Sequence, residues 1–258
     1  MIIAELVDFC NLKCALCWNR NREGSGKQMS LLTIKKIIKR YGNFRQQIAW
    51  FNWGEPLLYN EFESFSETIK ETKSTISSNF SLKLSNDKML ALCNFSTVCI
   101  SLSGMTSDIY NIYNCGGNFD LVIKNVKKLS TIGCKRVILK WQSHRYNNHQ
   151  FSMACDFAKE IGVGFESIPL VVGVEELIND FNHQLITVPK FNNIRSHCRL
   201  LSWPTIDVDG NYLLCCATHN IEIGYSIDDN IGLKELLIAK EKQPICITCR
   251  DKGYWRMY

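Results

Sequence analysis

The chain has 258 residues, of which 46% are hydrophobic, and a net charge of +5; this is enough apolar material for one large domain or a domain with an appendage. No apolar run approaches the roughly 20 residues of a membrane span. Glu5 and Asp8 interrupt the short apolar N-terminus, which argues against a signal peptide, and dispersed lysine and arginine do not indicate a nucleic-acid partner. We expect a cytoplasmic protein with no membrane partner, whose 13 cysteines point to metal ligation and not to a disulfide framework.

Apolar side chains recur with strand and helix periods along the chain up to about residue 170. Ser30 is placed to cap a helix and Gly42 to close it. Strict alternation of strands and helices implies a parallel sheet with right-handed crossovers. We expect strands at residues 2–7, 48–53, 80–84, 97–102, 136–141 and 165–168, and helices at residues 31–41, 62–69, 87–93, 119–129 and 151–161.

The pattern changes near Val172, where we expect a short helix and then a linker over residues 183–193. Beyond the linker, Asp209-Gly210-Asn211 separates two apolar runs, which is typical of a hairpin. A further helix is expected at residues 233–240. We therefore divide the chain into a domain of residues 1–185 and a smaller domain of residues 186–258.

Cys10, Cys14 and Cys17 follow the first expected strand with the spacing C-x3-C-x2-C. Three thiolates on one loop can each hold one iron of a four-iron, four-sulfur cube, which leaves the fourth iron without a protein ligand. Zinc, which prefers four ligands, and buried structural thiols are the alternatives. The spacing resembles the cluster-binding motif of the radical S-adenosylmethionine (SAM) superfamily.

This resemblance implies an α/β fold: a partial (β/α)6 TIM-like barrel with a small C-terminal α+β domain, and chemistry on the loops after the strands. In the superfamily, the open iron takes the amino and carboxylate groups of SAM. The reduced cluster then cleaves SAM to a 5′-deoxyadenosyl radical, which abstracts a hydrogen atom from the substrate. A flavodoxin- or ferredoxin-type protein is the implied electron donor.

The segment Asn52-Trp53-Gly54-Glu55-Pro56 follows the second expected strand. It resembles the Gly-Gly-Glu-Pro element that holds the amino group of SAM in the superfamily, with Trp53 in place of the first glycine. That contact uses backbone carbonyls and the glutamate, so we expect it to survive the replacement. Softer matches to SAM-contacting positions, each also compatible with a plain structural role, are Leu16, Ser85, Asn86, Ser101 and Ser103.

A further cysteine set lies in the C-terminal region, where Cys198-x11-Gly210-x4-Cys215 is followed by Cys246-x2-Cys249. The set resembles the shortened SPASM region called the Twitch domain, which holds one auxiliary four-iron cluster. Four thiolates can ligate every iron of a cube, although a four-cysteine zinc site has compatible spacing. The cofactors implied by the resemblance are two 4Fe-4S clusters and S-adenosyl-L-methionine.

Cysteines outside these two sets have two expected roles. Cys93, Cys99 and Cys155 are expected to be small buried hydrophobes. Cys115, after the fourth expected strand, and Cys216, beside the C-terminal set, are candidate hydrogen-atom donors to a substrate radical, as in radical SAM epimerases. Side chains near strand ends that could shape a polar substrate pocket are Lys83, Lys140, Trp141, Gln142 and Arg145.

Within the superfamily, the architecture is similar to that of 2-deoxy-scyllo-inosamine dehydrogenases. That similarity implies two-electron oxidation of an alcohol carbon on a sugar-like or other small biosynthetic intermediate. A redox-neutral epimerase and a peptide-modifying enzyme are the alternatives within the superfamily. A zinc-binding interaction module without catalysis is the alternative outside it.

Overall fold

The computed structural model describes residues 1–20, 25–43, 46–170, 198, 200–218 and 221–251. One sheet with the strand order β6-β5-β4-β3-β2-β1-β7-β8-β9 runs through this part of the chain. Its strands are β1 (Ile2–Ala4), β2 (Ile48–Ala49), β3 (Ser74–Ser78), β4 (Thr97–Leu102), β5 (Val137–Ser143), β6 (Gly164–Pro169), β7 (Thr205–Ile206), β8 (Asn211–Leu213) and β9 (Glu222–Ser226).

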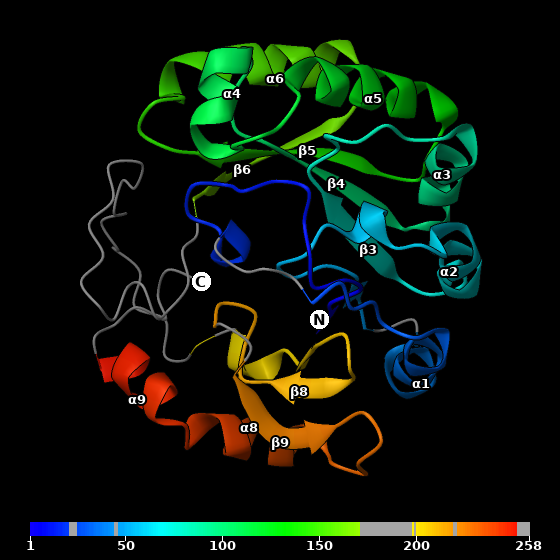
Figure 1. Ribbon diagram of the computed structural model, residues 1–258, viewed down its shortest axis with the longest axis vertical. Helices are drawn as coiled ribbons and strands as arrows, with labels where there is room; N and C mark the ends of the chain where they lie inside the picture. The colour runs from blue at the N-terminus through cyan, green and yellow to red at the C-terminus, as the bar shows by residue number, and fades with distance from the viewer. Residues whose placement is uncertain (21–24, 44–45, 171–197, 199, 219–220, 252–258) are drawn as a thin grey trace.

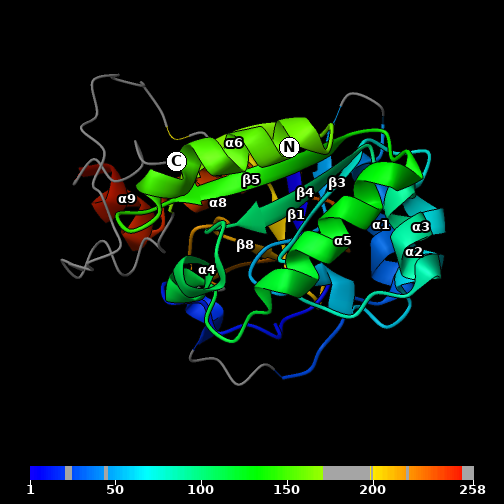
Figure 2. The same cartoon turned by 90° about the horizontal axis from the view of Figure 1, so that it is seen from above.

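Helices cover the outer side of the sheet. Figure 1 shows α4, α5 and α6 over strands β4 to β6, with α8 and α9 beyond β8 and β9, and Figure 2 shows α5 and α6 from above. The helices are α1 (Leu31–Tyr41), α2 (Phe62–Ile69), α3 (Asn86–Ala91), α4 (Ser107–Tyr113), α5 (Phe119–Ile132), α6 (Phe151–Glu160), α8 (Leu233–Glu241) and α9 (Pro244–Asp251). Short 3-10 helices are η1 (Trp18–Arg20), η2 (Pro56–Leu58), η3 (Leu92–Asn94), η4 (Asn148–Gln150) and η5 (Leu200–Ser202).

Strands β1 to β6 pair in parallel with their neighbours, as the alternation of strands and helices predicts. The prediction of an α/β partial barrel is therefore confirmed. In the described part of the chain, no helix has the length and hydropathy needed to span a bilayer.

Helix α1 forms where its sequence predicts it. The Ser30 hydroxyl accepts a hydrogen bond from the Thr33 amide at 3.0 Å, which satisfies one of the free N–H groups at the helix start. Ile34 and Ile37 lie on the buried face, and the Gly42 amide donates to the Ile38 carbonyl at 2.7 Å where the helix ends. Capping and apolar periodicity thus agree on the same boundaries.

The third strand is misplaced by the sequence prediction. Phe80, Leu82 and Leu84 alternate with polar residues, but the strand is Ser74–Ser78, and Phe80 has a φ of 56°. A positive φ is incompatible with a continuing strand, and the chain turns at Phe80. Small polar residues build the real strand, and it is defined by its place between β2 and β4.

The C-terminal region continues the same sheet. Thr205 and Ile206 of β7 pair in parallel with Ile3 and Ala4 of β1, and β7 and β8 form the expected hairpin. Gly210 turns that hairpin with a φ of 93°, a value that favours glycine. The expected short helix near Val172, the linker and the proposed boundary at residue 185 lie outside the described residues.

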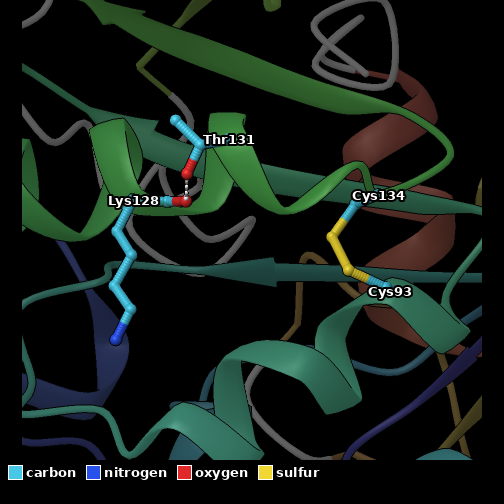
Figure 3. The surroundings of a disulfide bond; sticks show 4 residues. All are labelled: Cys93, Lys128, Thr131 and Cys134. Atoms are coloured by element: carbon cyan, nitrogen blue, oxygen red, sulfur yellow. Dashed lines mark hydrogen bonds between the residues drawn. A yellow bond between two sulfur atoms is a disulfide. The ribbon is translucent and has the colours of Figure 1, made fainter.

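Three elements were not expected from the sequence, namely α4, β9 and α9. One cysteine prediction is wrong: Cys93, at η3, forms a disulfide with Cys134, which follows α5. Figure 3 shows this bridge beside the last turns of α5, where the Thr131 hydroxyl donates to the Lys128 carbonyl at 2.8 Å. The disulfide forms because η3 and the end of α5 lie next to each other in the fold. The apolar periodicity within either helix does not reveal that contact. Cys99 is buried as expected, and Cys155 is half-buried.

Candidate active site

The N-terminal cysteine loop follows β1 and crosses the concave side of the sheet (Figure 1). Cys10, Cys14 and Cys17 are all half-buried. The loop is fixed to the end of α4, because the Lys13 amide donates to the Cys115 carbonyl at 3.0 Å and the Ala15 amide donates to the Tyr113 carbonyl at 2.8 Å. This anchor was not predicted, since α4 was not.

The three thiols lie close enough to influence one another's ionisation. Burial, together with the Glu55 carboxylate and the Cys17 thiolate, raises the pKa of Cys10 to about 12. Burial also raises the pKa of Cys14 well above its usual value, with Cys17 and Cys10 contributing. Such thiols ionise when a metal replaces the proton, so metal binding here would release protons.

Two asparagine side chains direct N–H groups at these sulfur atoms. Asn79, just after β3, donates from Nδ2 to Cys10 Sγ at 3.7 Å. Asn114, just after α4, donates from Nδ2 to Cys14 Sγ at 3.6 Å. The Leu12 amide also donates to Cys10 Sγ at 3.4 Å. These donors favour the charged thiolate over the neutral thiol.

The loop of residues 52–56 is fastened to β1 by Glu5. Glu5 Oε1 accepts from the amides of Trp53 at 2.9 Å and Gly54 at 3.1 Å. A Cβ atom at position 54 would lie 1.9 Å from the Val7 carbonyl oxygen, so only glycine permits this approach. Asn19, on the cysteine loop, donates from Nδ2 to the Trp53 carbonyl at 3.1 Å. The two loops are therefore directly bonded.

Glu55 is buried, and its carboxylate accepts hydrogen bonds from backbone amides. One carboxylate oxygen accepts from the Leu57 amide at 3.0 Å, where Pro56 begins η2, and the other accepts from the Asn79 amide at 2.9 Å. Burial raises the pKa of Glu55, and these amides oppose the rise. A carboxylate has about four acceptor positions, so Glu55 keeps capacity for a ligand. Asn52 Nδ2 is buried without a hydrogen-bond partner in the described structure.

The softer SAM candidates divide into three groups. Leu16 is buried against Tyr113 and Leu170. Ser103 is fully buried, and its hydroxyl is hydrogen-bonded to the Asn114 side chain, so it supports the residue that contacts Cys14. Ser85 caps α3 by accepting from the Lys88 amide at 3.0 Å. Ser85 and its neighbour Asn86 are both exposed.

The concave face of the sheet carries polar side chains toward the carboxyl ends of β4 and β5, beyond the apolar Cys99 and Ile138. Successive side chains of a strand point to opposite faces, and Val98, Ile100 and Leu102 of β4 belong to the core under the helices, which leaves Ser101 on the concave side. Lys140 lies on the same side, in register with Ser101. Its ammonium lies 6.0 Å from the ring centroid of Phe51, which follows β2, so the contact spans the concave face.

Other pocket candidates differ in their surroundings. Gln142 follows Lys140 on the concave side of β5, and its buried Oε1 has no hydrogen-bond partner in the described structure. Trp141 belongs to the core under the helices, and Lys83 and Arg145 are exposed. A separate hollow of about 260 Å³ lies where β5 and β6 begin, lined by residues that include Gly133, Arg136 and Gly164. That end of a parallel sheet is not where its chemistry is usually found.

The cysteines of the C-terminal region converge although they are distant in sequence. Cys215 and Cys249 are buried together, and Cys198 and Cys216 pack against them. Burial raises the pKa of Cys246 to about 12, with the nearby Cys215 and Cys198 thiolates adding to the rise. Burial likewise raises the pKa of Cys215 and Cys216. Four of these thiols thus share one packed cluster, and Cys246 lies within electrostatic reach of it. Among the described residues, no three His, Cys, Asp or Glu side chains already stand at metal-ligand distances, so the thiols would have to draw together on binding a cluster.

Cys115 lies against the cysteine loop through its backbone, and its thiol is half-buried. A negative charge on Cys115 would raise the pKa of Cys14, which means that the two side chains lie near each other. Cys216, by contrast, belongs to the C-terminal thiol group. The two hydrogen-donor candidates therefore occupy different sites.

A family model described as the Radical SAM superfamily matches residues 5–158, more than half of the 258 residues. The chain belongs to the radical SAM superfamily. Members of the superfamily bind SAM and a 4Fe-4S cluster, as the sequence predicts for this chain. The match includes the cysteine loop, the loop of residues 52–56, and strands β2 to β5.

Two curated relatives share part of this sequence. A probable GTP 3′,8-cyclase of Methanococcus maripaludis strain C7 is 27% identical over 184 residues, which cover 70% of this chain and 61% of the relative. A probable GTP 3′,8-cyclase of Methanocella arvoryzae is 24% identical over 178 residues, which cover 68% of this chain and 56% of the relative. The chain therefore spans less than two thirds of the length of these relatives.

Solved structures of three radical SAM enzymes have the same fold. The anSMEcpe enzyme with bound AdoMet matches with a TM-score of 0.67 and 14% identity, covering 100% of this chain and 88% of that chain. Streptococcus suis SuiB bound to precursor peptide SuiA gives 0.66 and 18%, covering 96% and 66%. BtrN in complex with AdoMet and 2-DOIA gives 0.52 and 16%, covering 97% and 85%.

The sequence alone does not single out Glu5, Asn79 and Asn114, which the structure brings to the cysteine loop and to the loop of residues 52–56. Asn79 was hidden because the third strand was placed several residues too late. Glu5 was seen only as a charge that interrupts an apolar run, which is itself a signal, because a buried carboxylate needs donors. Asn114 follows a helix that was not expected.

Proposed function

We propose that this chain holds a SAM-binding four-iron cluster on its N-terminal cysteine loop and a second four-iron cluster on its C-terminal cysteines, and that it oxidises a polar, sugar-like small molecule. The observation that carries the proposal is the presence of two separate groups of thiols: Cys10, Cys14 and Cys17 on the N-terminal loop, and the packed Cys198, Cys215, Cys216 and Cys249 with Cys246 near them. Three thiolates leave one iron of a cube open for SAM, whereas four thiolates close the cube.

Cys10, Cys14 and Cys17 would hold the first cluster, and Asn79 and Asn114 would donate hydrogen bonds to its thiolate sulfurs. Together the cluster and SAM would supply a 5′-deoxyadenosyl radical. The chain's own contribution is to position SAM and to shield the radical from solvent.

SAM would be held by the loop of residues 52–56 and by Leu16. Glu5 presents this loop to the cysteine loop, and Glu55 keeps acceptor capacity for the SAM amino group. The buried Asn52 amide, which has no partner among the described residues, is a further donor at this place. Ser101 could contact SAM or the substrate from β4, and Ser103 would act through Asn114. Ser85 and Asn86 are used at the α3 cap and are not part of this proposal.

The substrate would lie on the polar concave face beside Ser101, Lys140 and Gln142. Hydrogen abstraction from a carbinol carbon breaks its C–H bond and forms 5′-deoxyadenosine. The substrate radical would then lose its hydroxyl proton to solvent and one electron, and the C–O bond would become a carbonyl. The C-terminal cysteines would hold the cluster that accepts this electron, and a flavodoxin- or ferredoxin-type partner would remove it.

Two observations favour other substrates or outcomes. The curated relatives carry the name GTP 3′,8-cyclase, and SuiB was solved with a precursor peptide, so a nucleotide and a peptide are the second candidates. The nearness of Cys115 to the cysteine loop favours a redox-neutral epimerase, in which its thiol would return a hydrogen atom.

The test is the iron and sulfide content of anaerobically reconstituted protein, with the Cys10/Cys14/Cys17 triple alanine variant beside the wild type. We expect about eight irons per chain in the wild type and about four in the variant, because a 4Fe-4S cluster holds four irons. SAM cleavage should be lost in the variant. Zinc in place of iron, or iron unaffected by the triple change, would exclude the two-cluster proposal.

Product mass then separates the reactions. An oxidation removes two hydrogens from the substrate, whereas an epimerisation leaves its mass unchanged. The Cys115→Ala variant should retain oxidation. If the wild type instead returns a product of unchanged constitution that takes up one deuterium in D2O, and Cys115→Ala loses that uptake, Cys115 is the hydrogen donor and the epimerase replaces the oxidase.

A further inference from the structure

Lys240, on α8, is buried, and its ammonium has a hydrogen-bond acceptor but no anionic partner among the described residues. Its side chain is 1% exposed, and its ammonium donates to the Trp203 carbonyl at 2.7 Å. Trp203 packs against the C-terminal cysteine group. Among the described residues, no carboxylate forms an ion pair with Lys240. One carbonyl satisfies one of the three donors of an ammonium and supplies no negative charge.

Such burial needs compensation from a negative group. Removing an ammonium from water has an effective penalty of several kcal/mol unless an anion faces it. Trp203, whose carbonyl accepts from Lys240, packs with Cys198, Cys215, Cys216 and Cys249, so the negative groups available at this place are those thiols once they are ionised as metal ligands. Neutral thiols would leave the cation uncompensated. The charge of Lys240 is thus balanced only when the cysteines are negatively charged, as they are when they ligate a cluster.

We infer that Lys240 is the buried counter-ion of the C-terminal cysteine-ligated cluster, and that its charge makes the reduction potential of that cluster more positive. This inference rests on the proposed function, because it requires the second cluster. An electron added to the cluster increases its negative charge. A fixed cation in a poorly polarisable interior stabilises that reduced form more than the oxidised form. Charge and hydrogen bonding around a cluster are among the factors that set its potential.

The inference also links Lys240 to electron transfer. A more positive potential makes the C-terminal cluster a better acceptor for the electron that leaves the substrate radical. In this role Lys240 is a positioning and tuning residue, since it acts through the cluster and does not touch the reacting carbon.

The experiment uses the Cys10/Cys14/Cys17 triple alanine variant as parent, so that only the C-terminal cluster is observed. Lys240→Met keeps the length of the side chain and removes its charge, and Lys240→Arg keeps the charge. Lys234→Met is the matched control, because Lys234 is exposed on the same helix. The readouts are iron and sulfide content and the midpoint potential from an anaerobic redox titration followed by absorbance and electron paramagnetic resonance.

We expect the Lys240→Met variant to hold about four irons with a midpoint more negative than that of the parent. Lys240→Arg should lie closer to the parent, and Lys234→Met should equal it. An unshifted midpoint in Lys240→Met with the cluster intact would overturn the inference and leave the proposed function standing. A parent that binds zinc or no iron would overturn both.

Thermal melting of the cluster-free proteins covers the case in which Lys240→Met fails to hold iron. A buried cation that lacks its anion destabilises the folded protein. The cluster-free Lys240→Met protein should therefore melt at or above the melting temperature of its cluster-free parent. A marked loss of stability without the cluster would show that Lys240 serves only the packing of α8 through Trp203, and the inference would be wrong.

Discussion

At the scale of single residues, the proposed SAM site depends on side chains that contact the cysteine ligands without being ligands. Asn79 and Asn114 direct N–H groups at Cys10 and Cys14 from two different segments, one after β3 and one after α4. Asn79 is held in place because its own amide donates to Glu55 and its neighbour Phe80 adopts a positive φ. A strained conformation in a bulky residue persists where the surroundings fix it, and the Ser81 amide beyond this turn donates to Asn79 Oδ1 at 2.8 Å, which orients the Asn79 side chain.

We predict that Asn79→Ala and Asn114→Ala lose iron from the first cluster faster than the wild type. Groups that orient and hydrogen-bond metal ligands typically contribute about 10- to 100-fold in metal affinity, so we expect roughly tenfold faster release to a chelator. Asn94→Ala is the control, since Asn94 contacts Ser66 and Glu67 and not the cysteine loop. Equal release rates in all three variants would assign the two asparagines to loop packing alone.

The sequence singles out the three cysteines that we propose as ligands but not these asparagines, for a physical reason. Cys10, Cys14 and Cys17 lie within one short loop, so their spacing alone reports their chemistry. Asn79 becomes a neighbour of Cys10 only through the sheet, across a separation of 69 residues. A pairing of that kind requires the correct strand order and register, and the third strand was placed in the wrong segment.

At the scale of elements, predictions succeeded where one face of a helix or strand is buried. Helix α1 and strand β4 have clear apolar patterns, and both form within the expected residues. Strand β3 has a single large apolar residue, Ile76, and its Ser74 and Thr75 hydroxyls accept hydrogen bonds from the side chains of Trp50 and Gln47, which flank β2. Tertiary context overrides local preference in such a strand.

The disulfide between Cys93 and Cys134 joins two helical units of the outer layer, and we predict that it stabilises the protein when oxidised. The two residues are 41 positions apart. Loop-closure entropy for that length gives about 4 kcal/mol in the free energy of unfolding. Denaturant unfolding of the cluster-free protein with and without reductant should show this difference.

The Cys93→Ala/Cys134→Ala double variant provides the control for that measurement. It should unfold like the reduced wild type and should not respond to reductant through this pair. Because neither cysteine belongs to the two thiol groups proposed to bind clusters, its iron content after reconstitution should equal that of the wild type. A drop in iron would mean that this pair takes part in cluster loading.

At the scale of the whole molecule, the C-terminal cysteines stand on an extension of the barrel sheet. Strand β7 pairs with β1, and the Tyr41 and Tyr212 hydroxyls are hydrogen-bonded at 2.6 Å in the interior between α1 and β8. The same β1 strand that leads into the N-terminal cysteine loop therefore also carries the C-terminal region. The sequence does not reveal this strand pairing, because β1 and β7 are each only two or three residues long. The division near residue 185 falls outside the described residues and stays a prediction.

Substitution of Arg40 can test how much the contact between α1 and the C-terminal part of the sheet stabilises the protein. Its guanidinium donates to the Asp229 carbonyl at 2.6 Å, to the Ile227 carbonyl at 3.4 Å and also to the Ile231 carbonyl, all from α1 to the segment after β9. A hydrogen bond from a charged group contributes about 1.5–3 kcal/mol. We predict that Arg40→Ala lowers the free energy of unfolding by roughly 3 kcal/mol. The stability of Arg40→Lys should lie between those of the wild type and Arg40→Ala, because a lysine ammonium cannot reproduce the planar array of donors of the guanidinium.

Denaturant unfolding of the cluster-free protein, with Lys39→Ala as an exposed control on the same helix, measures this effect. If the sheet is one cooperative unit, Arg40→Ala shifts a single transition, and reconstituted protein loses iron from both cysteine groups as it unfolds. Two transitions in the wild type, with only one shifted by Arg40→Ala, would mean that the C-terminal region opens separately. The second cluster would then be lost before the first, and the electron acceptor would be uncoupled from the SAM site without any change in that site itself.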